Sequence, residues 1–590
     1  MQQVTLFYPR IKQPFPRAAT MTNPSKPWLT SYPEGVPPDI GTLPYNSLID
    51  MFEASFAQYP NRNACEYMGK FFTYSELNRL SKDFAAYLQG VGLAPGSRVA
   101  IMLPNIPQFQ IAMLGILRAG YVVVNVNPLY TARELEHQLN DSGASVLIIL
   151  ENFAHVLSQI LSKVSLKQTI VTSLGELLGL KGKMVDFVVR HVKKAVPPWQ
   201  LAHLSFTATL KQGSRRELNR PDISLDDIAF LQYTGGTTGV AKGATLLHRN
   251  ILANVIQTDL WLAPAMRNKH IDQLVFLCAL PMYHIFALTA CALFGMRRGG
   301  LLILVPNPRD IAGLIKLLDS HPGLHIFPGV NTLFNALVRR PDFLKLKMPN
   351  LLVTIGGGMA VQQVVADQWQ AATGVPIVEG YGLSETSPVA CVNSTLIKGF
   401  TGTIGLPVPS TEVVILDENE REVPFGTAGE ICIKGPQVMA GYWNKPDDTR
   451  QVFTTNGFFK SGDIGIMNQD GYTKIVDRKK DMINVSGFNV YPNELEEVIA
   501  KMPGVLETAV IGIPNDKSGE AVMVFIVKSD PALTEEQVFD YCKRELTNYK
   551  RPKLIQFRDE LPKTNVGKIL RRELRDIALR ENLTTKTRAD

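Results

Sequence analysis

The feature that most constrains this sequence is an eleven-residue stretch, Tyr233–Gly243, which holds four glycines, three threonines and one lysine. An apolar run at 228–231 precedes it, and 248–255 has the pattern of a helix start. Glycine permits positive φ angles and close backbone approach, so successive N–H groups can point at one anion. Threonine hydroxyls and Lys242 add donors and a positive charge. The stretch therefore predicts a phosphate-binding loop that follows a strand.

Two alternatives for this loop are weaker. It is not a Walker A loop, because no Gly-Lys pair followed by serine or threonine occurs at the required spacing. A flexible Gly/Thr linker would rarely have a strand before it and a lysine within it.

The chain has 590 residues, more than one hydrophobic core normally supports, so at least two domains are expected. Apolar runs at 99–103, 122–126 and 146–150 alternate with helical patterns at 107–118 and 131–140. This alternation indicates βαβ units and a parallel sheet, which binds ligands at the carboxyl ends of its strands. We predict an α/β fold with a large N-terminal domain of doubly wound sheets and helices, a small β subdomain, and a smaller, mobile α+β C-terminal lid.

Changes in this pattern predict the domain boundaries. Residues 1–40 are rich in proline and are expected to form an extended segment. The N-terminal domain, which would bind AMP and the acyl group, covers 41–478, and its β-rich part covers about 402–478. A run of charged residues at 479–481 marks a hinge, and 482–590 is long enough to form a lid domain.

Composition limits the class of protein. The hydrophobic share of 45% and the charged share of 19% are ordinary for a soluble globular protein. The net charge of +7 allows attraction to anionic nucleotides or lipids, and we find no motif for binding nucleic acid. The six cysteines are scattered without metal-ligand spacing, as expected of reduced thiols in a cytosolic protein. The first forty residues contain no apolar signal region, and Met21 is an alternative start.

Two segments bear on membranes. Residues 273–296 carry no formal charge and are long enough to cross a bilayer. Pro281 and His284 lie in their middle, which favours a buried strand, a turn and a buried helix over a membrane span. In 182–199, five valines share one helical face, basic residues lie around the other, and Trp199 follows two prolines. This pattern suits a helix lying on an anionic membrane and equally a helix docked on its own protein.

Two glycine-rich motifs after the loop can frame a nucleotide base. Gly357 and Gly358 follow the apolar run 351–355, so they stand at the carboxyl end of a predicted strand. Flat backbone at that place can lie along an adenine face. The motif at 379–386 offers Tyr381 for stacking and a carboxylate for further contacts.

Three charged side chains complete the candidate site. Asp463 ends a turn motif and can accept hydrogen bonds from both ribose hydroxyls, and Arg478 is a bidentate donor for hydroxyls or phosphate. Lys568 follows a glycine-containing turn near the C-terminus, from which it can reach across a cleft. A lone lysine is more often a surface residue, but the surrounding motif, 562–569, favours a role in the site.

In this order, the motifs resemble the adenylate-forming superfamily, which includes acyl-CoA synthetases, luciferases and peptide-synthetase adenylation domains. The resemblance spans most of the chain and rests on seven segments, 233–243, 281–288, 379–386, 429–443, 461–464, 475–492 and 562–568. It is closest to the bacterial long-chain fatty acyl-CoA synthetases, whose fatty-acid signature resembles 456–480. Phe458, Lys460-Ser461 and Met467 depart from that signature, which leaves the chain-length preference open.

The resemblance implies a two-step ligation with ATP, a long-chain fatty acid and coenzyme A as substrates and Mg²⁺ as cofactor. The first step gives acyl-AMP and pyrophosphate, and the second gives acyl-CoA and AMP. Thr234 and Glu385 are the implied Mg²⁺ ligands, and oxygen ligands with few protein contacts suit that ion. The implied ATP- and AMP-binding residues are Thr234, Gly235, Gly236, Thr237, Thr238, Gly239, Lys242, Gly357, Gly358, Tyr381, Gly382, Asp463 and Arg478.

The resemblance also implies catalytic roles for Lys568, Glu385, Thr234 and His284. Lys568 would bridge the substrate carboxylate and the α-phosphate, and His284 would border the acyl site. Rotation of the lid about Lys480 would then replace Lys568 by the loop that serves thioester formation, Ser486, Gly487 and Phe488.

A long acyl tail must be buried, and each buried methylene is worth about 0.8 kcal/mol. This energy favours a tunnel, for which the sequence suggests two wall segments, 330–334 and 356–359. We therefore predict an AMP-forming long-chain fatty acid–CoA ligase in the cytoplasm, peripherally associated with the inner membrane; the resemblance also allows a homodimer.

Three alternatives remain at this point. A fatty acyl-AMP ligase would form the adenylate and ignore free CoA, and a ligase for medium-chain or aromatic acids would differ only in its acyl site. A non-catalytic nucleotide- or acyl-binding protein is the third. The joint presence of Lys568, Glu385 and Asp463 disfavours it, because binding alone has little use for a lysine aimed at the reacting phosphate.

Overall fold

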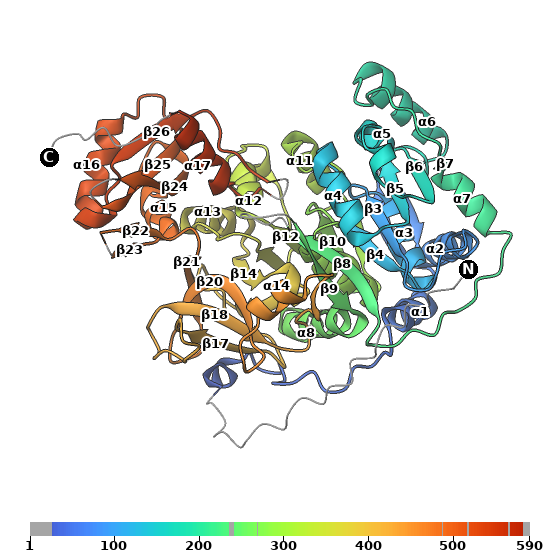
Figure 1. Ribbon diagram of the computed structural model, residues 1–590, viewed down its shortest axis with the longest axis horizontal. Coiled ribbons are helices and arrows are strands. Elements are labelled where there is room, and N and C mark those ends of the chain that lie inside the picture. Colours follow the sequence, from blue (N-terminus) through green and yellow to red (C-terminus); the bar gives the residue numbers. More distant parts are fainter. Residues whose placement is uncertain are drawn as a thin grey trace, which may run out of the picture.

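The computed structural model describes residues 26–234, 241–267, 269–486, 488–515, 518–564 and 567–581. The predicted loop residues Gly235, Gly236, Thr237, Thr238 and Gly239, and the predicted Gly487, lie outside these ranges. The C-terminal elements gather at one end of the elongated molecule, and the first strands of the chain lie at the other end (Figure 1). Within the described residues the strands form four sheets.

The two large sheets carry most of the predicted site. One has the order β16 (Leu406–Pro407), β15 (Val389–Val392), β14 (Ile377–Gly382), β13 (Val353–Gly356), β12 (Ile326–Gly329), β10 (Val275–Cys278), β11 (Leu301–Leu304), β1 (Asn63–Tyr67) and β2 (Lys70–Thr73). The other has the order β19 (Gly441–Tyr442), β9 (Lys242–Leu247), β8 (Ile228–Thr234), β4 (Val122–Asn125), β3 (Arg98–Met102), β5 (Val146–Leu150), β6 (Gln168–Thr172) and β7 (Leu204–Ser205). The inner strands of both are parallel, and antiparallel pairs occur toward the edges.

Two smaller sheets follow in the chain. The first is antiparallel and consists of β17 (Glu412–Leu416), β18 (Gly429–Lys434), β20 (Phe459–Met467) and β21 (Thr473–Arg478). The second contains β22 (Ile483–Val485), β23 (Phe488–Val490), β24 (Val505–Asn515), β25 (Gly519–Lys528) and β26 (Leu554–Arg558). The predicted domain boundaries remain predictions, and the short strands after 402 agree with the expected β-rich region.

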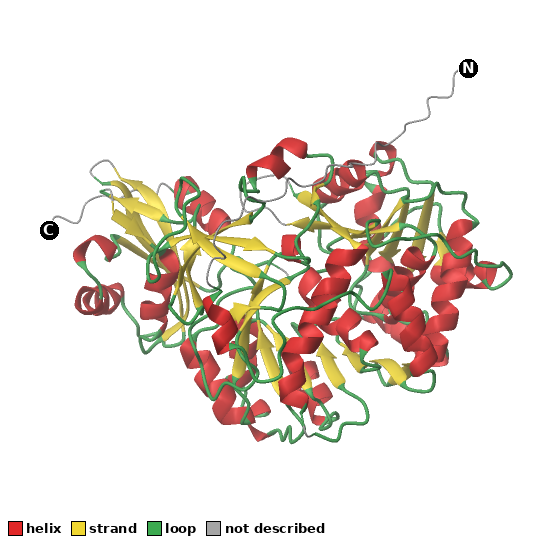
Figure 2. Cartoon of the chain, turned by 90° about the horizontal axis from the view of Figure 1, so that it is seen from below, coloured by secondary structure: helices red, strands yellow, loops and turns green. Residues whose placement is uncertain are grey.

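Helices cover the sheets on their outer faces (Figure 2). Those of the first half are α1 (Leu48–Gln58), α2 (Tyr74–Gln89), α3 (Pro107–Arg118), α4 (Ala132–Ser142), α5 (Ala154–Ser158), α6 (Leu180–Phe187), α7 (Phe206–Gly213) and α8 (His248–Met266). The second half contains α9 (Ile285–Ala287), α10 (Phe294–Arg297), α11 (Ile311–Asp319), α12 (Asn331–Val338), α13 (Gln363–Thr373), α14 (Pro446–Gln451), α15 (Pro492–Ala500), α16 (Glu535–Glu545) and α17 (Arg571–Arg580). The predicted fold class, a large mixed α/β domain with a small C-terminal domain, is confirmed.

The uncharged segment 273–296 forms buried strand β10, a turn, and a helical run that includes α9 and α10. Most of its apolar side chains pack in the largest hydrophobic core. Among the described residues, no helix is both long enough and apolar enough to cross a membrane. The prediction of a buried strand, turn and helix is confirmed.

The helix predicted at 182–199 is shorter in the structure. The helix α6 begins at Leu180 and continues as a π-helical turn, η4 (Val188–Val192), after which the helix ends. Trp199 is half-buried against a core cluster with its ring edge against His203. Val189 is buried and Val185 and Val188 are half-buried, whereas Val192 is exposed, so the valine stripe faces the protein only in part. Contact of this segment with a membrane stays a prediction.

Candidate active site

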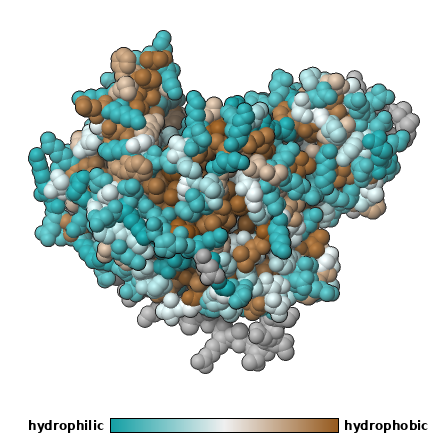
Figure 3. Space-filling model, turned by 180° about the vertical axis from the view of Figure 1, so that it is seen from behind, coloured by the Kyte–Doolittle hydropathy of each residue, from teal (hydrophilic) through white to brown (hydrophobic). Residues whose placement is uncertain are grey.

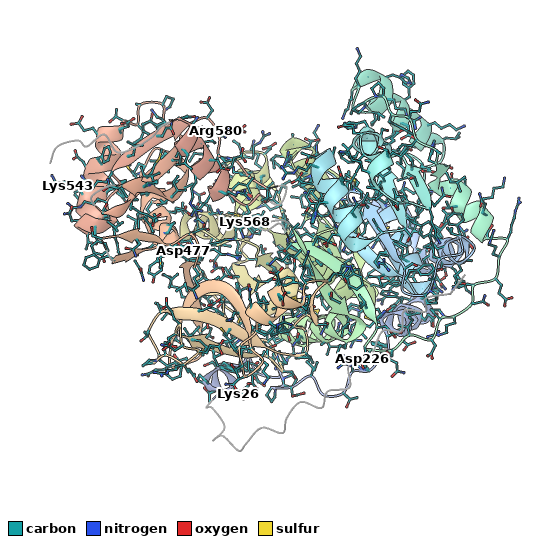
Figure 4. The ribbon with its side chains drawn as sticks, viewed as in Figure 1. Lys26, Asp226, Asp477, Lys543, Lys568 and Arg580 are labelled. Carbon is teal, nitrogen blue, oxygen red and sulfur yellow. The ribbon has the colours of Figure 1, made fainter. Side chains whose placement is uncertain are left out.

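A cavity of about 1260 Å³ lies where the C-terminal elements meet the two large sheets. Figure 4 shows Lys568 at this junction. The predicted residues that line the cavity are Thr234, Lys242, His284, Gly357, Gly358, Tyr381, Gly382, Glu385, Arg478, Lys480 and Lys568. The structure thus brings together residues that are more than 330 positions apart in the chain. Ser486 and Phe488 are predicted site residues that do not line the cavity.

The described ends of the predicted phosphate loop form a β-hairpin. Thr234 ends β8 and pairs with Lys242, which begins β9. Lys242 forms a salt bridge of 3.0 Å with Asp448 and lies over the ring of Tyr442. Thr234 and Lys242, described residues on either side of the loop, both line the cavity.

Two buried polar side chains, Tyr381 and Asp463, and half-buried Arg478 join β14, β20 and β21 beside the cavity. Tyr381 Oη donates a hydrogen bond of 2.6 Å to Asp463 Oδ2, and Arg478 Nε lies 2.6 Å from Asp463 Oδ1. Asp463 is only 2% exposed and stands opposite Arg478 in the antiparallel ladder. Each carboxylate oxygen can accept a second hydrogen bond, so Asp463 keeps acceptor capacity for ribose hydroxyls.

Glu385 lies on a short turn of helix, η7 (Ser384–Thr386), that follows β14. The preceding turn requires glycine at 382, because a Cβ there would lie 1.8 Å from the carbonyl oxygen of Pro388. Glu385 Oε1 accepts a hydrogen bond of 2.7 Å from Tyr442 Oη, and burial raises the pKa of its carboxyl group. The hydrogen bond from Tyr442 favours the charged carboxylate and so acts against the effect of burial, and a nearby cation would favour that form further.

Lys568 stands on a tight turn between β26 and α17. Its backbone N–H donates to Thr564 Oγ1 at 3.0 Å, and its carbonyl accepts from the N–H of Thr564 at 2.7 Å. Gly567 has φ of +79° and lies so close to α12 that a Cβ would be 2.2 Å from Thr332 Oγ1. This contact places the lysine over the N-terminal part of the site. Burial and then nearby Arg478 lower the pKa of Lys568 to about 8.

Comparison with known proteins identifies this arrangement. The model of the AMP-binding enzyme family matches residues 52–443, and that of the AMP-binding enzyme C-terminal domain matches 494–568. The chain belongs to the AMP-binding enzyme family. The predicted family is thereby confirmed.

Among relatives within this family, the long-chain-fatty-acid–CoA ligase of Escherichia coli O6:H1 is 52% identical, covering 94% of this chain and 98% of the relative. The long-chain-fatty-acid–CoA ligase of Haemophilus influenzae is 47% identical, covering 93% of this chain and 98% of the relative. The crystal structure of ATP-bound MatB from Rhodopseudomonas palustris is similar with a TM-score of 0.78 at 28% identity, covering 90% of this chain and 99% of that one.

The predicted hinge residue of this family member lines the cavity, whereas the described residues of the predicted thioester-step loop do not. Lys480 lines the cavity, and burial and Arg478 lower its pKa, whereas Lys479 pairs with Glu430 at 3.1 Å. Ser486 follows β22, and its N–H donates to the carbonyl of Ser518. Phe488 is 56% exposed and stacks on Tyr549, and neither Ser486 nor Phe488 lines the cavity that contains Lys568.

The cavity of this AMP-binding enzyme also has an apolar arm that the sequence did not reveal. The arm is lined by side chains from α8, the helical run after His284, β15 and the segment after β16, namely Trp261, Leu262, Ala290, Val392 and Val408. The pattern of α8 is that of any buried helix, so no local signal distinguished a cavity wall from solid core. Of the predicted wall segments, Val330, Gly357 and Gly358 line the cavity, whereas Phe334 packs in the core.

His284 lies between the apolar arm and Lys568. Its Nδ1 accepts a hydrogen bond of 3.4 Å from the N–H of Phe286. Burial, together with the charge of Lys568, lowers the pKa of His284 to about 4. The imidazole is therefore neutral at physiological pH and adds no cation that would compete with Lys568 for an anionic substrate.

We predict that the first half-reaction loses rate as the pH rises through about 8. Burial disfavours the ammonium form of Lys568, so its pKa falls to about 8 from 10.5, and the side chain is charged below that pH and neutral above it. The measurement is kcat/KM for ATP in acid-dependent pyrophosphate release between pH 6.5 and 9.5.

The matched control for this pH profile is Lys568→Arg, whose guanidinium stays charged across the range. Its activity is expected to be lower but to show no decline near pH 8. An identical decline in the variant would mean that another group causes it.

Proposed function

We propose that the protein is a long-chain fatty acid–CoA ligase that forms AMP. The observation that carries this proposal is one cavity in which a lysine of the lid, the ends of a phosphate loop and an apolar arm meet. The long-chain-fatty-acid–CoA ligases similar to this chain at 47–52% identity support the choice of substrates.

In the first step, a carboxylate oxygen of the fatty acid attacks the α-phosphorus of ATP. A new O–P bond forms, the bond from the α-phosphorus to the bridging oxygen breaks, and pyrophosphate leaves. Both reactants are anions, so the site must neutralise charge in the transition state. Lys568 lies where it can contact both groups, and it forms no salt bridge with any described residue that would hold it elsewhere.

The residues present fit a magnesium ion. The side chains of Thr234 and Glu385 present oxygen atoms to the cavity, and Mg²⁺ is commonly held by one or two protein oxygens together with phosphates. Groups of three or more potential metal-ligating side chains do not occur among the described residues, which excludes a metal cage only for that part of the chain. When bound, the ion would neutralise charge on the phosphates.

In the second step, the thiol of CoA loses its proton and attacks the carbonyl carbon of acyl-AMP. A C–S bond forms, the C–O bond to the phosphate breaks, and AMP leaves. We propose that the lid turns at 479–481 between the two steps, withdraws Lys568 and brings in Ser486, Gly487 and Phe488. Phe488 is exposed in the present arrangement of the domains, which supports the proposal that it contacts substrate after the lid has turned.

We further propose that the protein works in the cytoplasm as a peripheral protein of the inner membrane. The support is chemical: long-chain acids partition into lipid, and the cavity's apolar arm accepts the same tail.

The decisive experiment for the ligase function is pyrophosphate release from Mg-ATP with fatty acids from C6 to C18, with and without CoA. Turnover that depends on CoA and rises with chain length is expected. Adenylate without thioester would support the acyl-AMP ligase alternative, a maximum at C8 or with aromatic acids would support the other ligases, and no pyrophosphate with any acid would contradict catalysis.

We predict that Lys568→Ala lowers the rate of adenylate formation by about 10²- to 10³-fold, the usual effect of removing one donor that stabilises transition-state charge. Thioester formation from supplied acyl-AMP should be nearly unchanged, because Lys568 would have left the site. Lys347→Ala is the control, since Lys347 is exposed and does not line the cavity. Equal losses in both half-reactions would contradict the assigned role.

We predict that Trp261→Ala shifts the preference toward longer acids. Trp261 lines the apolar arm and is held by its Nε1–H, which donates to the carbonyl of Asn393 at 2.9 Å. Each additional buried methylene would raise kcat/KM about four-fold, so the ratio of C20 to C14 should rise at least roughly ten-fold. Trp369→Phe is the control, because Trp369 packs in the core without lining the arm. An unchanged ratio in Trp261→Ala would place the end of the arm elsewhere.

A further inference from the structure

The lobe formed by α6 and η4 exposes large apolar side chains to solvent. It stands out from the body of the molecule at the upper right of Figure 1 and carries apolar surface in the view from behind in Figure 3. Leu180, Met184, Phe187 and Val192 are exposed by 84%, 63%, 59% and 66%. The first three are spaced four and three residues apart, so they share one helical face. We call these four residues the α6 face.

The opposite side of the helix, which touches the protein, holds Val185 and Val189 together with small and polar residues. Gly182 packs so closely that a Cβ there would lie 1.8 Å from the carbonyl oxygen of Gly175. Asp186 accepts hydrogen bonds from the N–H of Gly175 at 2.8 Å and from Ser173 Oγ at 2.6 Å. Arg190 pairs with buried Glu151. The helix thus has apolar residues on both sides, and its largest apolar side chains lie on the side that faces solvent rather than the core.

The exposed apolar side chains of the α6 face indicate that a partner covers them. Single exposed hydrophobic residues are ordinary on protein surfaces, but a continuous set on one protruding helix commonly marks an interaction site. The hairpin turn between β1 and β2 extends the set, because Lys181 Nζ donates to the carbonyl of Met68, whose side chain is also exposed. The apolar surface thus belongs to two elements that are far apart in the chain.

The charge around the α6 face is positive. Lys183, Lys193 and Lys194 are exposed, and none forms a salt bridge with a residue that the structure describes. The acidic residues between 151 and 199 are Glu151, Glu176 and Asp186, and each is bonded to groups within the protein. No carboxylate among them is left to offset the lysines at the surface.

We propose that the α6 face docks on an anionic phospholipid surface, with the apolar side chains among the acyl chains and the lysines at the headgroups. An apolar helical face with a lysine rim is the pattern of helices that lie in a membrane interface. A second copy of this chain fits less well, because a symmetric contact would place both sets of lysines together. The docking site is argued independently of the proposed function. Only its biological purpose, access to long-chain acids in the membrane, rests on that function.

The test is flotation of the full-length protein with vesicles of phosphatidylcholine alone or with 30% phosphatidylglycerol. Binding is expected with the anionic vesicles and not with the neutral ones. The variant Leu180→Ser/Met184→Ser/Phe187→Ser should lose at least roughly ten-fold in partition coefficient, because it removes the inserted surface. Its control is Leu344→Ser/Leu396→Ser/Leu579→Ser, in which three leucines of 52%, 57% and 61% exposure elsewhere are changed in the same way.

The charge variant is Lys183→Gln/Lys193→Gln/Lys194→Gln, compared with Lys211→Gln/Lys345→Gln/Lys347→Gln, which removes three other exposed lysines. Each lysine near an anionic surface contributes roughly five-fold, so the first variant should lose about 100-fold and the control much less. Equal losses in the two charge variants would mean binding through net charge and would overturn the docking site.

Activity toward octanoate in solution separates this proposal from the ligase function. All four variants should keep the wild-type rate, since none touches the cavity, and this also shows that they fold. Wild-type flotation by the α6-face variant, or no flotation of the wild type, would overturn the membrane site while leaving the ligase function untouched. A dimer in solution that the α6-face variant abolishes would assign the face to contact between copies and would also overturn the proposal.

Discussion

The ion pair between Asp463 and Arg478 is the interaction on which the candidate site depends. It joins the two strands of the small β sheet, and the hydrogen bond from Tyr381 connects them to a strand of the large sheet. Removing one partner of a buried pair typically costs 3–5 kcal/mol, because the other charge stays buried and uncompensated. The pair also acts on Lys568, since the charge of Arg478 contributes to the lowered pKa of that lysine. The Asp463–Arg478 pair thus connects the predicted nucleotide pocket with Lys568, through Arg478, which lies just before the predicted hinge.

The cavity has a polar end and an apolar end, and the proposed chemistry needs both. Its polar end gathers Thr234, Glu385 and Lys568, which suit phosphates and a carboxylate, and its other end is apolar up to Trp261. A fatty acid requires both, because its charged head reacts while its tail must leave water. Neutral His284 stands at the boundary, where a second cation would hold the carboxylate away from the reacting phosphate.

Local patterns in the sequence predicted much of the secondary structure. The expected helix at 107–118 is found with those bounds, and the strand at 146–150 agrees as well. The described site residues inferred from the family resemblance line one cavity, with three exceptions. Asp463 is bonded to two lining residues beside it, and Ser486 and Phe488 stay on the surface of the C-terminal domain. In the proposed mechanism the place of these last two depends on the rotation of a domain, and no sequence pattern records which of two arrangements a chain adopts. The apolar arm was missed because a helix that lines a cavity and a helix in solid core have the same composition.

The sequence by itself determined the periodicity of the elements, the glycine-rich motifs and the family, because each depends on residues close together in the chain. The tertiary structure decided which face of each helix meets the protein. In 182–199 the valine stripe was visible, but the close contact of Gly182 with Gly175 and the buried bonds of Asp186 turn Leu180, Met184 and Phe187 outward. The physical reason is that the burial of a helix face depends on which other parts of the chain pack against it. The periodicity of the sequence describes the helix alone and does not record those neighbours.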